Sequence, residues 1–163
     1  MKLFSTEGRY DCALEKEKGK VLDVGCGNFY SARNIVAKKE KEIYYIGLDY
    51  NINYILEAKN ESKKLQNADF VAADARYLPF RKDSFDVVLD IGTRTIKTKI
   101  ESERILNKEK EVLKNDGKYM VLHDCKFSNI EEDIEYILPK TSEIEEIHYD
   151  PFKRRILVKA YLK

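Results

Sequence analysis

Val21-Leu22-Asp23-Val24-Gly25-Cys26-Gly27-Asn28-Phe29-Tyr30 is the stretch that decides the fold, because an apolar run ends there in an acid and two closely spaced glycines. The pattern predicts a strand, a tight turn and then a helix. In an open parallel sheet, ligands bind in the crevice beyond the carboxyl ends of the strands, where glycines let a ligand approach the bare backbone. The Gly-x-Gly pair alone does not specify a ligand, since both glycines could serve only the sharp turn.

Length and composition favour a single domain over residues 1–163, with 1–19 as a short N-terminal segment. A domain of about 150 residues buries roughly 68–70% of its unfolded surface, which is enough for one core. Hydrophobic residues make up 43% of the chain, so disorder is not expected, and a net charge of +1 provides no general attraction for nucleic acid.

The cysteines and the apolar runs predict the compartment. Cys12, Cys26 and Cys125 are far apart and odd in number, which predicts neither a disulfide framework nor a metal site. No segment approaches the roughly 20 apolar residues of a membrane span. We therefore expect a cytoplasmic protein without a membrane partner. Many Lys, Glu and Ile residues and a single glutamine are typical of proteins from hot environments.

A strand-then-helix pattern repeats along the chain before a closing hairpin. Five parallel strands are expected, at Lys20–Val24, Ile43–Asp49, Asp69–Ala73, Ser84–Asp90 and Lys118–His123. The last two runs, Ser142–Tyr149 and Arg154–Leu162, are linked too closely for a parallel crossover and therefore predict an antiparallel pair. The predicted fold is α/β: a Rossmann-like, doubly wound, mostly parallel seven-stranded sheet closed by a C-terminal antiparallel hairpin.

The expected helices follow from caps and apolar spacing. The first two are expected at Asp11–Lys18 and at Ser31–Lys39, with Ser31 as the cap of the second. A third helix is capped by Asn51 or Asn53. The last two are Glu101–Lys114, ended by Asn115-Asp116-Gly117, and a helix that runs from a capping box at Ser128 to Pro139. In the helix after Asn51, we expect Ile52, Ile55 and Leu56 to lie on one apolar face.

Asp23, Asp49, Asp74 and Asp90 each fall at or just past the end of a predicted parallel strand, so we expect four carboxylates along one rim. Clustered carboxylates raise one another's pKa values unless a ligand or hydrogen-bond donors occupy them. Asp49 lies 22 residues beyond Gly27, a position from which a carboxylate can accept hydrogen bonds from a ribose diol. The rim is therefore a candidate site for an adenosine-containing ligand.

Several motifs together resemble the class I S-adenosylmethionine-dependent methyltransferases, from about Lys20 to Leu162. The matching runs are Asp23-Val24-Gly25-Cys26-Gly27, Gly47-Leu48-Asp49-Tyr50-Asn51, Ala73-Asp74-Ala75 followed by Leu78-Pro79-Phe80, Ser84–Asp90 and Val112–Lys118. The resemblance implies S-adenosyl-L-methionine as the cofactor and a methyltransferase activity. It names Asp23, Gly25, Cys26, Gly27, Asn28, Asp49, Tyr50, Asp74, Ala75 and Asp90 as cofactor-binding residues, and no metal ligands.

Within that set, the resemblance implies specific contacts. The glycine turn would lie against the methionine part, Asp49 would bind the ribose hydroxyls, and Tyr50 would lie against the adenine. Asp74 or the backbone of Ala75 would bind the adenine amino group. A catalytic base would be needed only if the acceptor must lose a proton, and His123 is the candidate, although backbone groups could equally satisfy this histidine.

The chain also departs from the family pattern. Phe29 stands where relatives often have a small residue, and Ile91-Gly92-Thr93-Arg94 replaces the Asn-Pro-Pro-Tyr-like run of amine-directed relatives. Methylation of an adenine or glutamine nitrogen is therefore disfavoured. Arg94, Lys97 and Lys99 would meet an acidic acceptor or form a solvated loop.

Three functional classes remain open from the sequence. The first is an active methyltransferase with an unidentified acceptor, either a macromolecule or a small molecule, whose open site is covered by a homodimer or a partner subunit. The second is a non-catalytic protein that binds an adenosine ligand, favoured if Phe29 or Tyr30 blocks the methyl face. The third, an NAD-dependent oxidoreductase, is disfavoured because Tyr30 replaces the third glycine of the dinucleotide motif.

Two further residues have alternative interpretations. Cys26 is either a reactive thiol near a helix start or, as we favour, a small, half-buried filler. Tyr10 either folds over the cofactor or, in the favoured interpretation, packs the N-terminal segment against the domain.

Overall fold

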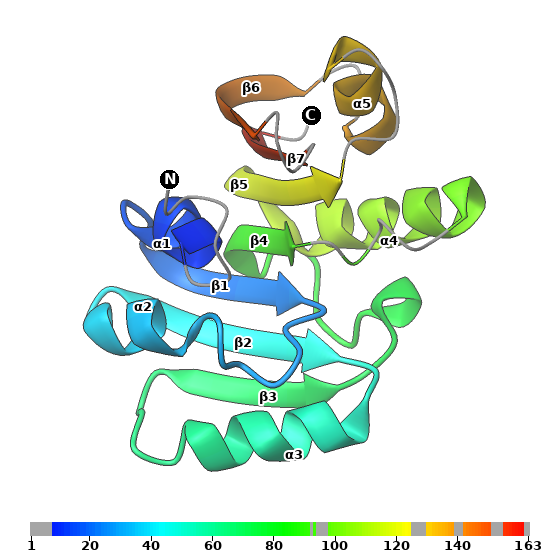
Figure 1. Ribbon diagram of the computed structural model, residues 1–163. Helices are drawn as coiled ribbons and strands as arrows, with labels where there is room; N and C mark the ends of the chain where they lie inside the picture. Colours follow the sequence, from blue (N-terminus) through cyan, green and yellow to red (C-terminus); the bar gives the residue numbers. More distant parts are fainter. Residues whose placement is uncertain are drawn as a thin grey trace.

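The computed structural model describes residues 8–91, 93, 98–124, 130–138, 142–150 and 155–161. These residues form one seven-stranded sheet in the order β3-β2-β1-β4-β5-β7-β6 (Figure 1). The parallel strands are β1 (Gly19–Val24), β2 (Ile43–Asp49), β3 (Ala68–Ala72), β4 (Phe85–Ile91) and β5 (Leu113–Asp124). Two antiparallel strands, β7 (Arg155–Tyr161) and β6 (Glu143–Asp150), complete it. The predicted Rossmann-like sheet and its closing hairpin are confirmed.

Helices cover both faces of the sheet. One hydrophobic cluster contains residues of α1 (Gly8–Leu14), α2 (Arg33–Lys38) and α3 (Ile52–Glu61), and the other contains residues of α4 (Lys99–Val112) and α5 (Ile130–Ile137). Neighbouring residues of β1 enter different clusters, Val21 the first and Leu22 the second. This alternation is the period of a strand buried on both faces, and it explains the consecutive apolar residues in β1 and β4.

Two helix starts differ from the prediction. The N-terminal helix spans Gly8–Leu14, not Asp11–Lys18, and α2 begins at Arg33 after an Ala32 cap that makes no side-chain hydrogen bond. The proposed Ser31 cap is therefore wrong. The cause lies in Phe29, which has a positive φ of 69° and is only 1% exposed. Burying this ring keeps the chain in turns up to residue 32, so the helix starts late.

The bounds of α4 also differ from the prediction. This helix begins at Lys99 because Thr98 forms a capping box with Glu101, a signal that the expected start at Glu101 overlooked. It ends at Val112, and β5 starts at Leu113 without a separate turn. Asn115-Asp116-Gly117 lies within β5, opposite a register irregularity between Phe85 and Val87 of β4.

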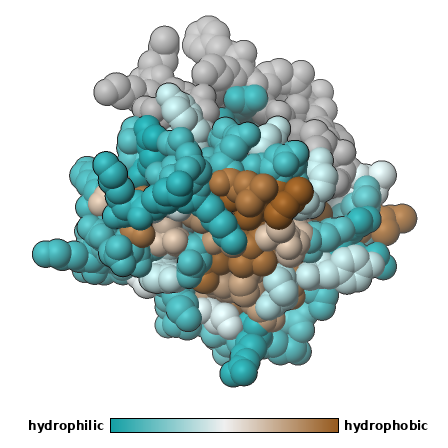
Figure 2. Space-filling view, turned by 90° about the horizontal axis from the view of Figure 1, so that it is seen from below, coloured by the Kyte–Doolittle hydropathy of each residue, from teal (hydrophilic) through white to brown (hydrophobic). Residues whose placement is uncertain are grey.

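In α3, the buried face differs in part from the predicted one. Ile55 is buried together with Ala58, whereas Ile52 and Leu56 are 54% and 57% exposed. The helix packs by a stripe that continues to Ser62, which is 6% exposed. Figure 2, seen from the side of α3 and the edge strand β3, shows apolar surface near the centre of this face. Of the two predicted caps, Asn51 is the one used, since its side chain accepts a hydrogen bond from the Asn53 N–H.

Some predictions concern residues outside the described part of the chain. These are Arg94, Lys97, Cys125, Ser128, Pro139, Arg154 and Leu162. Among the residues that are described, no helix has the length and apolar character needed to cross a membrane.

Candidate functional site

A cavity of about 450 Å³ is lined by residues at or beyond the carboxyl ends of β1, β2, β3 and β4. The arrowheads in Figure 1 mark these strand ends. Its volume is within the range of small-ligand sites. Five predicted cofactor-binding residues line it: Gly25, Asp49, Tyr50, Asp74 and Ala75. The sequence analysis did not assign a site role to the others: Leu48, Ala73, Arg76, Ile91, Thr93 and Ile105. A more open groove of about 760 Å³ at the amino ends of the strands contains none of the predicted site residues.

Asp49 is the best-oriented acid of the cavity. It is 7% exposed, and its two oxygens accept hydrogen bonds from the backbone N–H groups of Gly27 (3.1 Å) and Asn51 (2.9 Å). A carboxylate has about four acceptor positions, so these two bonds fix its direction and leave room for two more. Asp49 can therefore accept the paired hydroxyls of a ribose.

The two glycines of the turn have different environments. Both have positive φ, 78° at Gly25 and 58° at Gly27. A Cβ on Gly25 would lie 2.1 Å from Thr93 Oγ1, whereas a Cβ on Gly27 would meet nothing within 4 Å. Gly25 is therefore needed for close packing inside the protein, whereas the space beside Gly27 is open, although Gly27 does not line the cavity.

Asp74 is held by a basic residue that the sequence analysis missed. Its carboxylate accepts from the Arg76 N–H at 2.9 Å and, as a cap, starts the short 3-10 helix η1 (Ala75–Tyr77). The Arg76 guanidinium also donates to both oxygens of Asp74, at 2.6 and 3.0 Å, and lies 3.5 Å from Glu101. Because Arg76 already engages Asp74, the backbone of Ala75 is the freer candidate for reading an adenine. The opposite charges at positions 74 and 76 were the available signal.

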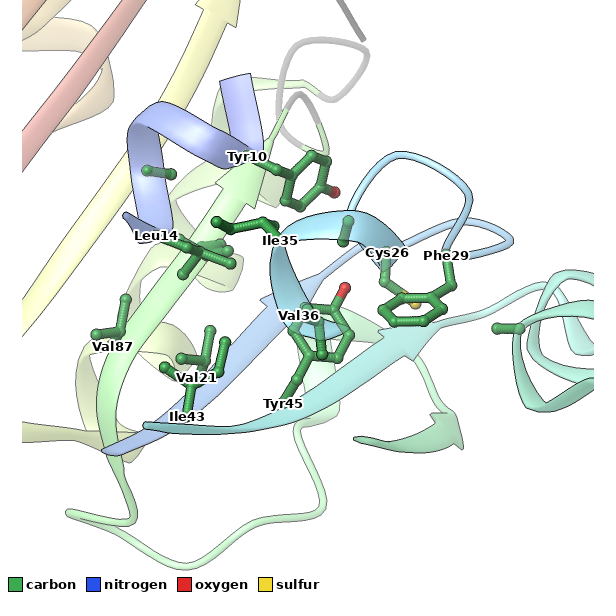
Figure 3. Close-up of a cluster of buried hydrophobic side chains, with 14 of the residues drawn as sticks. Tyr10, Leu14, Val21, Cys26, Phe29, Ile35, Val36, Ile43, Tyr45 and Val87 are labelled. Carbon is green, nitrogen blue, oxygen red and sulfur yellow. The ribbon is translucent and has the colours of Figure 1, made fainter. Parts of the chain in front are cut away.

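Asp23 lies inside the protein, away from the cavity lining. It is 0% exposed, and both Tyr10 (2.9 Å) and Tyr45 donate to its Oδ2, while its Oδ1 has no partner among the described residues. Burial raises the pKa of Asp23 to about 6, although the two hydroxyls oppose that shift. Figure 3 shows both tyrosines in the cluster with Cys26 and Phe29. Tyr10 therefore packs the N-terminal helix against the sheet, as the favoured interpretation held.

The expected rim of four carboxylates is correct for only two of them. Asp49 and Asp74 line the cavity, whereas Asp23 and Asp90 are fully buried. The register gives the reason: Asp23 pairs with Gly47, two residues before Asp49, so its side chain lies back from the edge. Asp90 is engaged by the loop that follows β4, accepting from the Thr93 N–H at 2.9 Å.

Cys26, Gly27, Asn28 and His123 are also absent from the cavity lining. Cys26 is 7% exposed and its burial raises the pKa of the thiol, which confirms the filler interpretation. Asn28 joins the turn to α3 through a 3.2 Å hydrogen bond to Glu57. His123 is 1% exposed in β5, where it pairs with Ile156 of β7.

Neither bulky residue after the glycines lines the cavity. Phe29 packs in an aromatic cluster, with ring centroids 5.2 Å from Tyr45 and 4.9 Å from Phe70. Tyr30 is 58% exposed, and the Arg33 guanidinium lies 5.7 Å from its ring. Lys99 is exposed in the first turn of α4. Among the described residues, no group of three or more His, Cys, Asp or Glu side chains is placed to hold a metal ion.

Comparison with protein families gives a direct result. The family model described as a methyltransferase domain matches residues 15–153. This chain belongs to that methyltransferase family. The resemblance found in the sequence motifs is thereby confirmed, and the match covers every strand from β1 to β6.

Individual relatives support the same family. A demethylmenaquinone methyltransferase from Thermotoga maritima is 31% identical over 110 residues, which are 67% of this chain and 45% of that protein. The magnesium protoporphyrin IX methyltransferase of Synechocystis PCC 6803, solved with bound S-adenosylmethionine, matches with a TM-score of 0.74 at 16% identity, covering 95% of this chain and 76% of that one. The [4+2]-cyclase SpnF matches with a TM-score of 0.78 at 14% identity, covering 94% and 79%. The structural matches show the fold.

The chain spans about half the length of the curated relatives it matches, from 42% to 54% of their sequences.

Proposed function

We propose that this chain binds S-adenosyl-L-methionine in the 450 Å³ cavity and transfers its methyl group to an acceptor. The observation that carries the proposal is Asp49, a nearly buried carboxylate aimed by two backbone N–H groups into a cavity at the carboxyl end of a parallel sheet. The membership of the chain in the methyltransferase family agrees with this assignment.

The residues present fit that cofactor. Asp49 would accept the ribose hydroxyls, and Tyr50 and the backbone of Ala75 would hold the adenine. Gly27 would allow close approach of the ligand to the turn, since nothing lies within 4 Å of its bare face. Leu48, Ile91 and Ile105 provide apolar walls to the cavity.

Bound there, S-adenosylmethionine supplies a methyl group on a sulfonium centre, which an acceptor can attack in line. The charge on sulfur disappears in this step, so apolar walls that exclude water favour it. The protein's main contribution is to align the acceptor, and alignment can lower a barrier by about 7–11 kcal/mol. No nucleophilic side chain is required, and the burial of Cys26 is consistent with that.

We further propose that the acceptor approaches across the open rim. A second copy of the chain or a partner subunit would then complete the enclosure of the site. The exposed aromatic side chains there support this: Tyr50 is 80% exposed, Tyr77 65% and Tyr30 58%. Aromatic side chains of this kind are enriched in binding surfaces. Ile91-Gly92-Thr93-Arg94 disfavours a planar amine as the acceptor, so we propose another class of methylated atom.

Calorimetry tests the cofactor. The protein should bind S-adenosylmethionine and S-adenosylhomocysteine but not NAD, and Asp49→Asn should weaken both interactions. Binding of NAD alone would overturn the proposal. Incubation with methyl-labelled cofactor and fractionated lysate should then move label to a protein, RNA or small-molecule fraction, with Asp49→Asn as the matched control.

A second candidate function is binding without methyl transfer. The observation behind it is that SpnF, a [4+2]-cyclase, shares this fold, so the fold does not by itself require methyl transfer. The labelling experiment separates the two candidates: a chain that binds the cofactor stoichiometrically yet transfers no label to any fraction is not a methyltransferase on its own.

A further inference from the structure

Thr93 connects two segments that are distant in the sequence. Its hydroxyl donates to the backbone carbonyl of Val24 at 2.6 Å, and its N–H donates to Asp90 Oδ1 at 2.9 Å. The same hydroxyl lies against the bare face of Gly25, where a Cβ would be only 2.1 Å away. Thr93 therefore links the end of β4, through Asp90, to the end of β1 and its glycine turn.

Thr93 also lines the cavity, together with Gly25 and Ile91. These three residues follow or end β1 and β4, whereas Asp49, Asp74 and Ala75 follow β2 and β3. The strand order β3-β2-β1-β4 separates the two groups along the sheet edge. An adenosyl group bound by Asp49 and Ala75 would leave the β1–β4 end for the remainder of the cofactor, which carries the sulfur and the amino acid.

We propose that Thr93 is a positioning residue that sets the width of the β1–β4 end of the cavity, and so favours adenosine ligands that carry an amino-acid tail over adenosine itself. This inference rests on the proposed function. The hydrogen bond to Val24 and the contact with Gly25 hold Thr93, one wall of that end, at a fixed distance from the glycine turn, the other wall. Without the hydroxyl, residue 93 loses its attachment to Val24. The adenosine end, formed by Asp49 and Ala75, keeps all of its contacts.

Three variants test this. Thr93→Ser keeps the hydroxyl, Thr93→Val keeps the shape and removes the hydroxyl, and Thr93→Ala removes the hydroxyl without adding bulk near Gly25. Calorimetry with adenosine and S-adenosylhomocysteine as probes measures the ratio of their dissociation constants in each protein. Thermal unfolding followed by circular dichroism confirms that each variant is folded.

The expected result is a selective loss of affinity. Thr93→Val and Thr93→Ala should raise the dissociation constant for S-adenosylhomocysteine at least fivefold, about the effect of one hydrogen bond. The dissociation constant for adenosine should change by less than twofold. Thr93→Ser should keep the wild-type ratio. A merely structural role would weaken both probes together and leave the ratio unchanged.

One result would overturn the inference while the proposed function stands: an unchanged ratio in both hydroxyl-free variants, whether the two probes keep their affinities or weaken equally. If the wild-type protein binds neither probe, the proposed function fails and the inference fails with it. The Thr93→Ala variant keeps the test decisive if Thr93→Val does not fold.

Discussion

Replacing Asp23 by asparagine should change how the stability of the protein depends on pH. The carboxylate is fully buried, and Tyr10 and Tyr45 both donate to one of its oxygens. Asparagine has nearly the same shape and can still accept from both hydroxyls through its amide oxygen, but it does not ionise. The variant therefore removes one titration and keeps the packing.

The magnitude follows from the pKa of Asp23, which burial raises from 3.8 to about 6. One pKa unit corresponds to about 1.4 kcal/mol, so the raised pKa changes the free energy of unfolding by about 3 kcal/mol between the protonated and the ionised form. Because the folded protein holds this proton more tightly than the unfolded chain, the stabilisation is fully present below pH 3.8 and is lost as the pH rises through 6. Relative to wild type, Asp23→Asn should gain about 3 kcal/mol of unfolding free energy from low pH to pH 7.

Urea unfolding between pH 4 and 7 at constant ionic strength measures this difference. The chain has no tryptophan, so circular dichroism is the appropriate signal. Asp69→Asn is the matched control, because Asp69 also accepts from a tyrosine, Tyr44, but in an exposed pair. Using the difference between variant and wild type cancels the contributions of all other titrating groups.

Parallel stability curves for wild type and Asp23→Asn from pH 4 to 7 would refute the reasoning, because they would mean that the carboxylate titrates at its ordinary pKa. A difference that grows toward low pH would also refute it, since it would require a pKa below 3.8. A slope of equal size in Asp69→Asn would show that the effect does not come from burial.

Three further predictions concern the turn and the cavity. Tyr10→Phe removes a donor to the ionised carboxylate and should move the pH midpoint of the Asp23 effect above 6, measured by the same urea series. Gly25→Ala should lower the unfolding free energy by at least about 2 kcal/mol, because its Cβ meets Thr93, and equilibrium unfolding should show a smaller loss for Gly27→Ala, where the space is open. Asp49→Asn should weaken adenosine and S-adenosylhomocysteine alike, tenfold or more by calorimetry, in contrast to the selective effect expected at Thr93.

The sequence was sufficient to predict the positions of the strands along the chain and which of them are parallel. Apolar runs such as Val87-Val88-Leu89 have no polar alternation, so they must be covered on both faces, and helices between them impose parallel pairing. Because parallel strands end at one edge, the cavity and the place of Asp49 and Asp74 followed from the topology alone.

The sequence was not sufficient to place the acids relative to the cavity. Asp23 and Asp49 both end apolar runs, but pairing of Asp23 with Gly47 puts it two residues back from the edge. A register of this kind depends on which residues pair across strands, and no local pattern contains it. The role of Thr93 was hidden for the same reason, since its partners Val24 and Gly25 lie far back in the chain.

The glycine turn is thus held from two sides by groups that do different work. Behind it, Asp23 joins β1 to the N-terminal helix through Tyr10, which keeps the end of the strand in place. In front of it, Thr93 holds the Val24 carbonyl. The Gly27 N–H that aims Asp49 follows these two attachments, three residues after Val24. Asp23→Ala removes the attachment through Tyr10 and should therefore weaken adenosine binding, although Asp23 lies outside the cavity lining and Asp49 is unchanged, whereas Thr93 should act on the amino-acid tail alone.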